Sequence, residues 1–416
     1  MNFQKLFLPL VLVFAIITGC SPVNGKAPSS EQKEVLRLAC WVSDLEIQSL
    51  VETYNNSQDK YKIEIISFFE RGNDIQSVLD RMNIELATNN SFDLYYLDSL
   101  DTMRLSNAGL LADINEYING DSSFSKDDFI WNIWKLFEKN GKLYEIIPNF
   151  QIMGVVGPIS LLNGCENWTI SSYPEFAKGK NITLYTNAED MLSFMIQYSL
   201  EQYIDIEDGT CNFTTEEFYN WMKFIASFSH TDENAERLRI RSIDGIYDYA
   251  VLKDEYQQQP FCVGIPDNSG DNISARAVCS FAISSQTKHR DACWNFCKML
   301  LSQDVQENIF CSFGFPINRA VLNSQLLRAQ LPPGNGNYIF KNITSQSGRD
   351  IQPLDNNDIK YIHNIIDSTS SVCLRYDEIY EIIYEDMAKY LSGDATEEET
   401  ATIIQNRVQI FLSERV

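Results

Sequence analysis

Apolar and polar positions along the first hundred residues predict strands and helices in turn. Three short apolar runs have the length of buried strands: residues 35–41, 61–68 and 92–97. Two stretches between them carry an apolar side chain at every third or fourth position, as one face of a helix does: Ile47, Leu50, Val51 and Tyr54, then Ile75, Val78, Leu79, Met82 and Leu86. Ser43 and Glu46 have capping-box spacing and predict the start of the first helix. This alternation predicts an α/β fold with a parallel sheet and helices on its faces.

In such a sheet, ligands bind beyond the carboxyl ends of the strands, where the connecting loops converge. The three loops here, residues 41–44, 68–71 and 97–100, offer aromatic rings and polar groups. Both suit a sugar, which presents C–H faces to rings and hydroxyls to carboxylates and amides. The candidate ligand contacts are Trp41, Ser43, Phe69, Glu70, Asp98 and Ser99. The alternative is that Trp41 and Phe68 are core residues that finish their strands.

The amino terminus has the pattern of a bacterial lipoprotein export signal. Lys5 precedes an apolar run over residues 6–17, and Ile-Thr-Gly-Cys at 17–20 is a small-residue junction before an acylated cysteine. The apolar run is shorter than the ~20 residues that span a bilayer, which disfavours a retained transmembrane helix. We expect a signal peptide at 1–19, lipid on Cys20, and a flexible tether at 20–33 that holds the protein at the membrane outside the cytoplasm.

Composition excludes some classes of protein. The formal net charge of −24 would repel nucleic-acid phosphates, so we expect no nucleic-acid partner. Once Cys20 carries lipid, nine of the ten cysteines remain, an odd number for disulfides. Cys293 and Cys297 lie one helical turn apart, but a chain with three histidines gives little support to a zinc site. We expect most cysteines to be small buried apolar residues, and we expect no metal and no cofactor.

Helical stripes also recur in the second half of the chain. Capping-box spacing at Thr214–Glu217 and Thr396–Glu399 predicts two helix starts. The apolar stripes of three helices are Phe218, Trp221, Ile225 and Phe228; Ile379, Ile382, Ile383 and Met387; and Ile404, Val408 and Phe411. These helices are interpreted as structural, with Trp221 in the core.

Several segments, in order along nearly the whole mature chain, resemble the extracellular solute-binding lipoproteins of ABC importers, in the family that includes sugar and maltose binders. The segments are residues 107–114, 140–144 with Pro148, 263–266, 292–301 with Gln306, and 314–318. The closing stretch, 385–391 and 405–407, is similar to the terminal helices of clostridial-type members.

The resemblance implies a two-lobed, type II periplasmic-binding-protein-like fold, in which each lobe is a mainly parallel sheet flanked by helices and the ligand cleft lies between the lobes. By position, the first lobe comprises 34–148 and 267–313, and the second 149–266 and 314–416. Hinges are expected at 149–151, 263–266 and 314–316, which contain or adjoin Pro or Gly. Candidate ligand contacts from the second lobe are Phe150, Gln151, Tyr247 and Asn268, with Ser269, Asp271 and Tyr249 as further candidates. Trp168 is expected either on the cleft or beneath the lobe.

The predicted function is capture of a small polar solute, a mono- or oligosaccharide, by a monomer that delivers it to an ABC transporter permease. One alternative is a receptor for a peptide or a polyol phosphate, in which Arg71 and Arg276 pair with an anion. Another is a surface glycoside hydrolase using Glu70 and Asp98. Both of these carboxylates would lie on one lobe, and neither a Gly-x-Ser-x-Gly nor a Walker pattern occurs, so we expect no enzyme.

Overall fold

A computed structural model describes most of the chain. The described residues are 33–69, 78, 82, 84–85, 92–97, 102–184, 187–205, 208–229, 235–270, 272–308, 314–341, 343–344, 348–372 and 377–413. The predicted signal peptide, Cys20 and all of the predicted tether except Lys33 lie outside them, as do Glu70, Arg71, Asp98, Ser99 and Asp271.

The amino-terminal strands form the parallel sheet that their pattern predicted. Strand β1 (Glu34–Cys40) pairs in parallel with β2 (Tyr61–Ser67) and with β3 (Leu94–Tyr96). Helix α1 (Leu45–Ser57) connects β1 to β2 and buries the predicted stripe Ile47, Leu50, Val51 and Tyr54. Its cap is Asp44 and not the predicted Ser43. The Asp44 carboxylate accepts the Ile47 N–H, whereas the Ser43 hydroxyl accepts the Gln48 side-chain amide.

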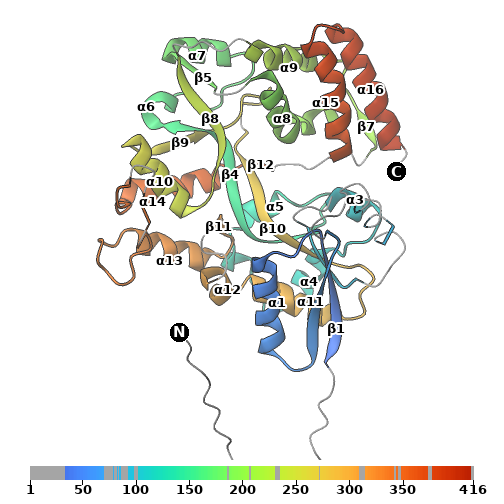
Figure 1. The fold of residues 1–416 in the computed structure, drawn as a ribbon, viewed down its shortest axis with the longest axis vertical. Coiled ribbons are helices and arrows are strands. Elements are labelled where there is room, and N and C mark those ends of the chain that lie inside the picture. The colour runs from blue at the N-terminus through green and yellow to red at the C-terminus, as the bar shows by residue number, and fades with distance from the viewer. Residues whose placement is uncertain are drawn as a thin grey trace, which may run out of the picture.

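Two long strands carry the sheet from one end of the molecule to the other (Figure 1). Strands β4 (Ile146–Pro158) and β10 (Ser274–Ile283) pair antiparallel, and β10 also pairs with β3. The path is β2-β1-β3-β10-β4-β8-β5. The other strands are β5 (Ile182–Leu184), β8 (Glu236–Ile243), β9 (Pro260–Val263), β11 (Phe315–Pro316) and β12 (Ser371–Val372), with β6 (Ile204–Asp205) and β7 (Thr210–Cys211) in a separate pair. Because β4 runs antiparallel to β8, β9, β10 and β11, the sheet is mixed where a mainly parallel one was predicted.

Helices cover both ends of this sheet. Those of the first half are α3 (Thr102–Asn107), α4 (Ile114–Gly120), α5 (Trp131–Lys135), α6 (Ile159–Leu162), α7 (Tyr173–Lys180) and α8 (Ala188–Ser199). Those of the second half are α9 (Glu216–Ala226), α10 (Ile246–Tyr256), α11 (Arg290–Leu300), α12 (Gln303–Asn308), α13 (Arg319–Ala329), α14 (Asn356–Asp367), α15 (Asp377–Leu391) and α16 (Glu397–Ser413). Short 3₁₀ turns lie at η1 (Lys126–Asp128), η2 (Glu201–Tyr203) and η3 (Ser227–Ser229). Among the described residues, no helix combines the length and the apolar character that a membrane span needs.

The apolar side chains form two large cores that meet along β4. The first core contains Leu38, Ile146, Phe150, Ile152 and Phe281 with the buried faces of α1, α10, α11, α13 and α14. The second core contains Met153, Val155, Leu184 and Leu238 with the buried faces of α8, α9, α15 and α16. A third, smaller core lies on the other face of the amino-terminal strands and consists of Ala39, Phe68, Val78, Met82, Phe92, Tyr95, Leu97, Leu105, Leu111 and Ala282. In Figure 1 the second core is in the upper part and α1 and α11 of the first core are in the lower part.

The carboxy-terminal third divides between these cores. Helices α15 and α16 pack in the second core, and the capping box predicted at Thr396 and Glu399 is present, with both reciprocal hydrogen bonds at 3.0 and 3.2 Å. Residues of α13 and α14, such as Leu326 and Ile362, belong instead to the first core, although the predicted lobe limits place all of 314–416 in the second lobe. Helix α14 differs from α15 and α16 because its apolar face packs toward α5. There the Asn132 side chain donates to the Ile366 carbonyl at 3.1 Å.

Two tryptophans of the second core, Trp221 and Trp168, are buried. Trp221 is 0% exposed and Trp168 1% exposed, so Trp168 packs beneath the lobe and not on a cleft. Helix α9 is capped by Thr215, whose hydroxyl accepts the Phe218 N–H, one residue after the predicted Thr214.

Glycines allow three backbone segments to touch beside β4. Gly245 has φ 95° and ψ −168°, a conformation almost restricted to glycine, and a Cβ there would lie 2.4 Å from the Gly314 carbonyl oxygen. A Cβ on Gly314, itself at φ 74°, would lie 2.6 Å from the Phe150 carbonyl oxygen. Strand β11, which follows Gly314, pairs with β4 at Asn149 and Phe150. Two of the three predicted hinge segments are therefore in backbone contact.

We predict that Gly245→Ala destabilises the protein more than Gly334→Ala does. Gly334 also has a positive φ, 93°, but nothing lies within 4 Å of its added Cβ. Both variants carry backbone strain of about 1–3 kcal/mol, and Gly245→Ala adds an overpacking cost of about 1–3 kcal/mol. Urea unfolding followed by circular dichroism measures the difference. Equal losses in the two variants would show that the contact with Gly314 is unimportant.

Candidate functional site

An aromatic pair lies at the carboxyl ends of β1 and β2, where the sequence predicted ligand contacts. Trp41 and Phe69 follow these two adjacent parallel strands, and the Phe69 N–H donates to the Trp41 carbonyl at 2.8 Å. Their rings are stacked, with centroids 5.6 Å apart and an angle of 22° between the planes. Both side chains are half-buried against the third core. Phe68, in contrast, is 1% exposed and is the core residue that finishes its strand. Trp41 and Phe69 thus form an aromatic platform at the surface of the third core.

A polar pair, Gln151 and Arg276, lies on the antiparallel strands β4 and β10. The two residues are register partners on β4 and β10, and Arg276 Nε donates to Gln151 Oε1 at 3.0 Å. Arg276 Nη2 donates to the same oxygen. Gln151 is 8% exposed, whereas Arg276 is exposed.

Side-chain alternation places this polar pair on the same face of the sheet as the aromatic platform. The odd-numbered residues of β10, including Ala275 and Phe281, pack in the first core. The even-numbered residues point to the other face, where Ala282 belongs to the third core on which Trp41 and Phe69 rest. Arg276 is even-numbered, so it lies on the face of the third core. At β10, one face of the sheet is therefore filled by the first core, and the opposite face carries the platform and the polar pair. Farther along β4, this second face is covered by the second core at Met153 and Val155.

Phe150 does not line this face. Its side chain is 0% exposed, belongs to the first core and packs on Phe315 with ring centroids 5.7 Å apart. The structure gives no support to a ligand contact by the Phe150 side chain, because successive residues of a strand point to opposite faces and Gln151 takes the open one. The residue pattern indicated this segment but did not indicate which of the two neighbouring side chains faces outward.

The other second-lobe candidates are engaged with nearby side chains. Tyr247 is half-buried at the start of α10, and its ring meets the edge of Phe340 at a centroid distance of 5.7 Å. Asn268 lies in the loop between β9 and β10 and donates to the Tyr203 hydroxyl at 2.8 Å and to Gln202 Oε1 at 3.1 Å. The hydrogen bond to Asn268 lowers the pKa of Tyr203, but burial outweighs it and the pKa is raised. Whether Tyr247 and Asn268 contact a solute stays a prediction.

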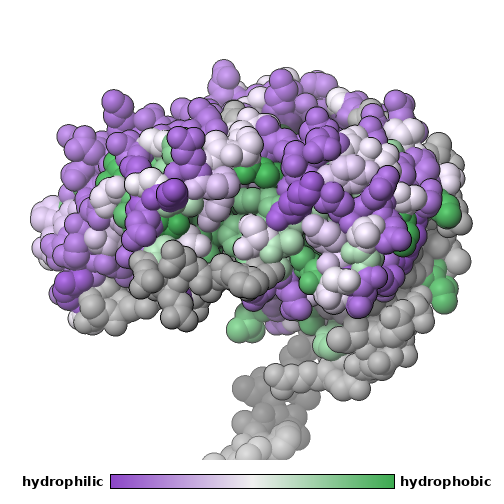
Figure 2. All heavy atoms as spheres, turned by 90° about the horizontal axis from the view of Figure 1, so that it is seen from above, coloured by the Kyte–Doolittle hydropathy of each residue, from purple (hydrophilic) through white to green (hydrophobic). Residues whose placement is uncertain are grey.

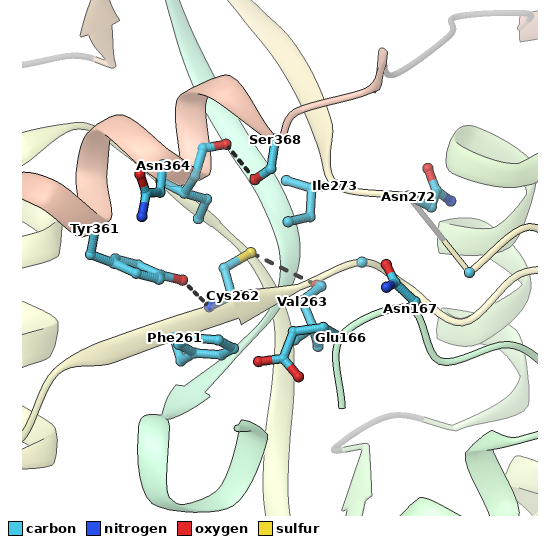
Figure 3. Close-up of a pocket in the computed structure, with 13 residues that line it drawn as sticks. Glu166, Asn167, Phe261, Cys262, Val263, Asn272, Ile273, Tyr361, Asn364 and Ser368 are labelled. Atoms are coloured by element: carbon cyan, nitrogen blue, oxygen red, sulfur yellow. Dashed lines mark hydrogen bonds between the residues drawn. The ribbon is translucent and has the colours of Figure 1, made fainter. Parts of the chain in front are cut away.

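A cavity of about 310 Å³ lies between α14 and the end of β9 (Figure 3). Its floor includes Phe261 and Tyr361, whose rings stack at 5.3 Å, and the Tyr361 hydroxyl accepts the Cys262 N–H at 2.7 Å. Polar groups at its rim include Glu166 and Asn364. Its lining includes Cys262 of the first core and Val263 of the second. Sequence reasoning missed it because its walls come from segments almost two hundred residues apart.

The face of the molecule drawn in Figure 2 is mainly hydrophilic. Seen from above the view of Figure 1, hydrophilic side chains dominate, and hydrophobic ones gather in a hollow near the middle of the face (Figure 2). Within the described residues, no group of three His, Cys, Asp or Glu side chains is placed to hold a metal ion. Cys293 and Cys297 are each 0% exposed, which confirms their prediction as buried apolar residues.

Neither a protein-family model nor a curated protein sequence matches the chain. Solved structures do match its fold. The sugar-binding protein MalE from Xanthomonas citri has a TM-score of 0.60 at 12% identity, covering 92% of this chain and 98% of that one. An ABC substrate-binding protein from Listeria monocytogenes, in complex with cycloalternan, has a TM-score of 0.54 at 12% identity, covering 92% and 100%.

A solute-binding protein of an ABC transporter from Thermotoga lettingae, bound with α-D-tagatose, has a TM-score of 0.55 at 13% identity and covers 92% of this chain and 100% of that one. The predicted two-lobed fold of periplasmic binding proteins is therefore confirmed, with a large mixed sheet flanked by helices.

We predict that the buried thiols are unreactive in the folded protein. Burial raises the pKa of Cys262 and of Cys293 to about 12, and that of Cys40 to about 11. Since the thiolate is the nucleophile and a free cysteine has a pKa of ~8.5, these sites should alkylate at least tenfold more slowly than free cysteine at pH 8. Iodoacetamide labelling followed by peptide mass spectrometry measures each site. The same sites should label fully in 8 M urea, and rapid labelling of Cys262 without urea would contradict its burial.

Proposed function

We propose that the protein is an extracytoplasmic, lipid-anchored receptor that binds a mono- or oligosaccharide and delivers it to an ABC transporter permease. The observation that carries this proposal is the aromatic platform of Trp41 and Phe69 on the same sheet face as Gln151 and Arg276. Structures of the same fold are described as binding proteins with cycloalternan, α-D-tagatose or acarbose. Their descriptions concern binding, which supports a receptor and not an enzyme.

The chemistry of this face suits a sugar. An exposed ring surface packs against the C–H face of a sugar, and amide and guanidinium groups bond its hydroxyls. The two cores meet along β4, and two of the predicted hinge segments, at Phe150 and Gly314, are in backbone contact beside it. Such a junction permits the two lobes to close around a ligand by hinge motion. We propose a first lobe of residues 34–148 and 267–313 and a second lobe of residues 149–266 and 314–416. Helices α13 and α14 differ from this division, because they pack in the first core.

The location follows from the amino-terminal pattern. We propose that residues 1–19 are removed, that Cys20 is acylated and that residues 20–33 tether a monomeric receptor to the outer face of the cell membrane. A receptor held beside a permease needs no membrane-spanning helix of its own, since the lipid keeps it in place. The receptor can then deliver the solute to the permease without leaving the membrane surface.

We predict that a saccharide raises the melting temperature of the protein and that Trp41→Ala abolishes this shift. Ligand at ~100 times its dissociation constant stabilises the native state by about 2.7 kcal/mol, a readily measured change. Trp41 is half-buried at a surface, so its loss should change the melting temperature of the free protein little. A thermal-shift screen against saccharides, peptides and anions measures both quantities.

Trp131→Ala is the matched control for that screen. Trp131 is also half-buried and packs on Trp134 at 5.4 Å, but it belongs to the first core on the opposite face. Its variant should keep the ligand response. A large loss of intrinsic stability in Trp41→Ala would make Trp41 a core residue, and a shift with peptides alone would replace the carbohydrate with a peptide.

We predict that Cys20→Ser releases the protein from the membrane. Only cysteine offers the thiol that lipoprotein maturation acylates, so the wild type should fractionate with membranes and incorporate labelled palmitate, and the variant should do neither. Expression of both in a bacterial host, followed by cell fractionation, measures this. Equal membrane association of the two forms would contradict the anchor. A variant at Cys40, which is buried in β1, controls for loss of a thiol.

A further inference from the structure

Arg276 is a charged residue in an unusual place. It lies on β10 in the interior of the sheet, next to Ala275, which is 0% exposed, yet its own side chain is exposed on the face of the aromatic platform. In the part of the chain that the structure describes, no carboxylate forms an ion pair with Arg276, although the protein carries 57 acidic residues against 33 basic ones. A carboxylate is the usual partner of an arginine at such a site.

Gln151 fixes the orientation of the guanidinium. Its carbonyl oxygen accepts from both Nε and Nη2, which are neighbouring donors on one edge of the planar group. Gln151 is itself more than nine-tenths buried, at 8% exposed, so it is a rigid support. Arginine has five N–H donors. Gln151 does not use the N–H groups of Nη1 or the second hydrogen of Nη2. One N–H of Nη1 and this second N–H of Nη2 point in parallel from the outer edge of the guanidinium.

We propose that Arg276 binds a carboxylate of the solute, so that the cargo is an acidic saccharide that contains a uronic acid. This proposal rests on the proposed function and names its substrate class. Two parallel N–H donors match the two oxygens of a carboxylate, which is planar, in a bidentate contact. The sugar ring would pack on Trp41 and Phe69, which share this face of the sheet. Gln151 is then a positioning residue that acts through Arg276.

Pairs of sugars that differ only in the carboxylate test the proposal. The full-length protein, in mild detergent, is titrated by calorimetry with galacturonic acid and galactose, with glucuronic acid and glucose, with di- and trigalacturonic acid, and with glucose 6-phosphate. The expected result is at least tenfold tighter binding of a uronate than of its neutral partner. Because exposed charges are screened by salt, this preference should shrink between 20 mM and 500 mM NaCl.

Variants at Arg276 separate charge from geometry. Arg276→Gln should weaken uronate binding at least tenfold and leave the weak binding of the neutral sugar unchanged. Arg276→Lys keeps the charge without the planar fork and should give an intermediate loss. Arg239→Gln is the matched control, since it removes the same charge from an exposed residue of β8 in the same sheet. The melting temperatures of all three variants report whether they are folded.

The outcomes separate the two proposals. Neutral sugars that bind as tightly as uronates, or uronate binding that Arg276→Gln leaves intact, would overturn the acidic cargo and keep the sugar receptor. Preferential binding of glucose 6-phosphate would overturn the carboxylate in favour of a phosphate. If no saccharide of any kind binds, both the inference and the proposed carbohydrate function fail.

Discussion

The architecture depends on close backbone contact beside β4, the strand along which the two large cores meet. Gly245, Gly314 and the Phe150 carbonyl lie within a space that admits no Cβ atoms, so three separate chain segments meet at one point. Each segment leads to a different element: α10, β11 and β4. Close packing fixes the starts of α10 and β11 against the middle of β4, and the contact consists mainly of backbone atoms, with the Val278 side chain beside Gly314.

The contact also determines which side chains are open to solvent. Strand β4 is fixed against β11 at Asn149 and Phe150, so Phe150 must face the first core. Alternation then turns Gln151 to the opposite face, and pairing with β10 places Arg276 beside it. A one-residue slip of β4 in this register would turn Gln151 into the first core and expose Phe150. The glycine contact and the polar pair are thus linked by strand geometry, although they lie on opposite faces of the sheet.

Local pattern in the sequence predicted more of the fold than of the site. The strands and the stripe of α1 were correct because one buried face leaves a clear period in the sequence. The helix cap was displaced by one residue, from Ser43 to Asp44, since both side chains can accept an N–H and only the chain path decides between them. The sequence predicted both Phe150 and Gln151 as ligand contacts, because the alternation of side chains along a strand does not show which face of the sheet is open. The pairing of α14 with the first core depends on contacts over two hundred residues in sequence and leaves no local signal.

The large negative charge of the protein does not conflict with an anionic cargo. Charges on the surface are screened over a Debye length of ≈ 8 Å at physiological ionic strength, so distant carboxylates contribute little at Arg276. What a bound carboxylate experiences is set by the groups that touch it. Arg276 is held by a neutral amide and not by an acid, so the positive charge is not cancelled by its support. An ion pair with a protein carboxylate would hold the guanidinium equally well but would leave it with no net attraction for an anion. The choice of glutamine at position 151 therefore preserves the charge while fixing its direction, and this is the arrangement that an anion-binding arginine requires.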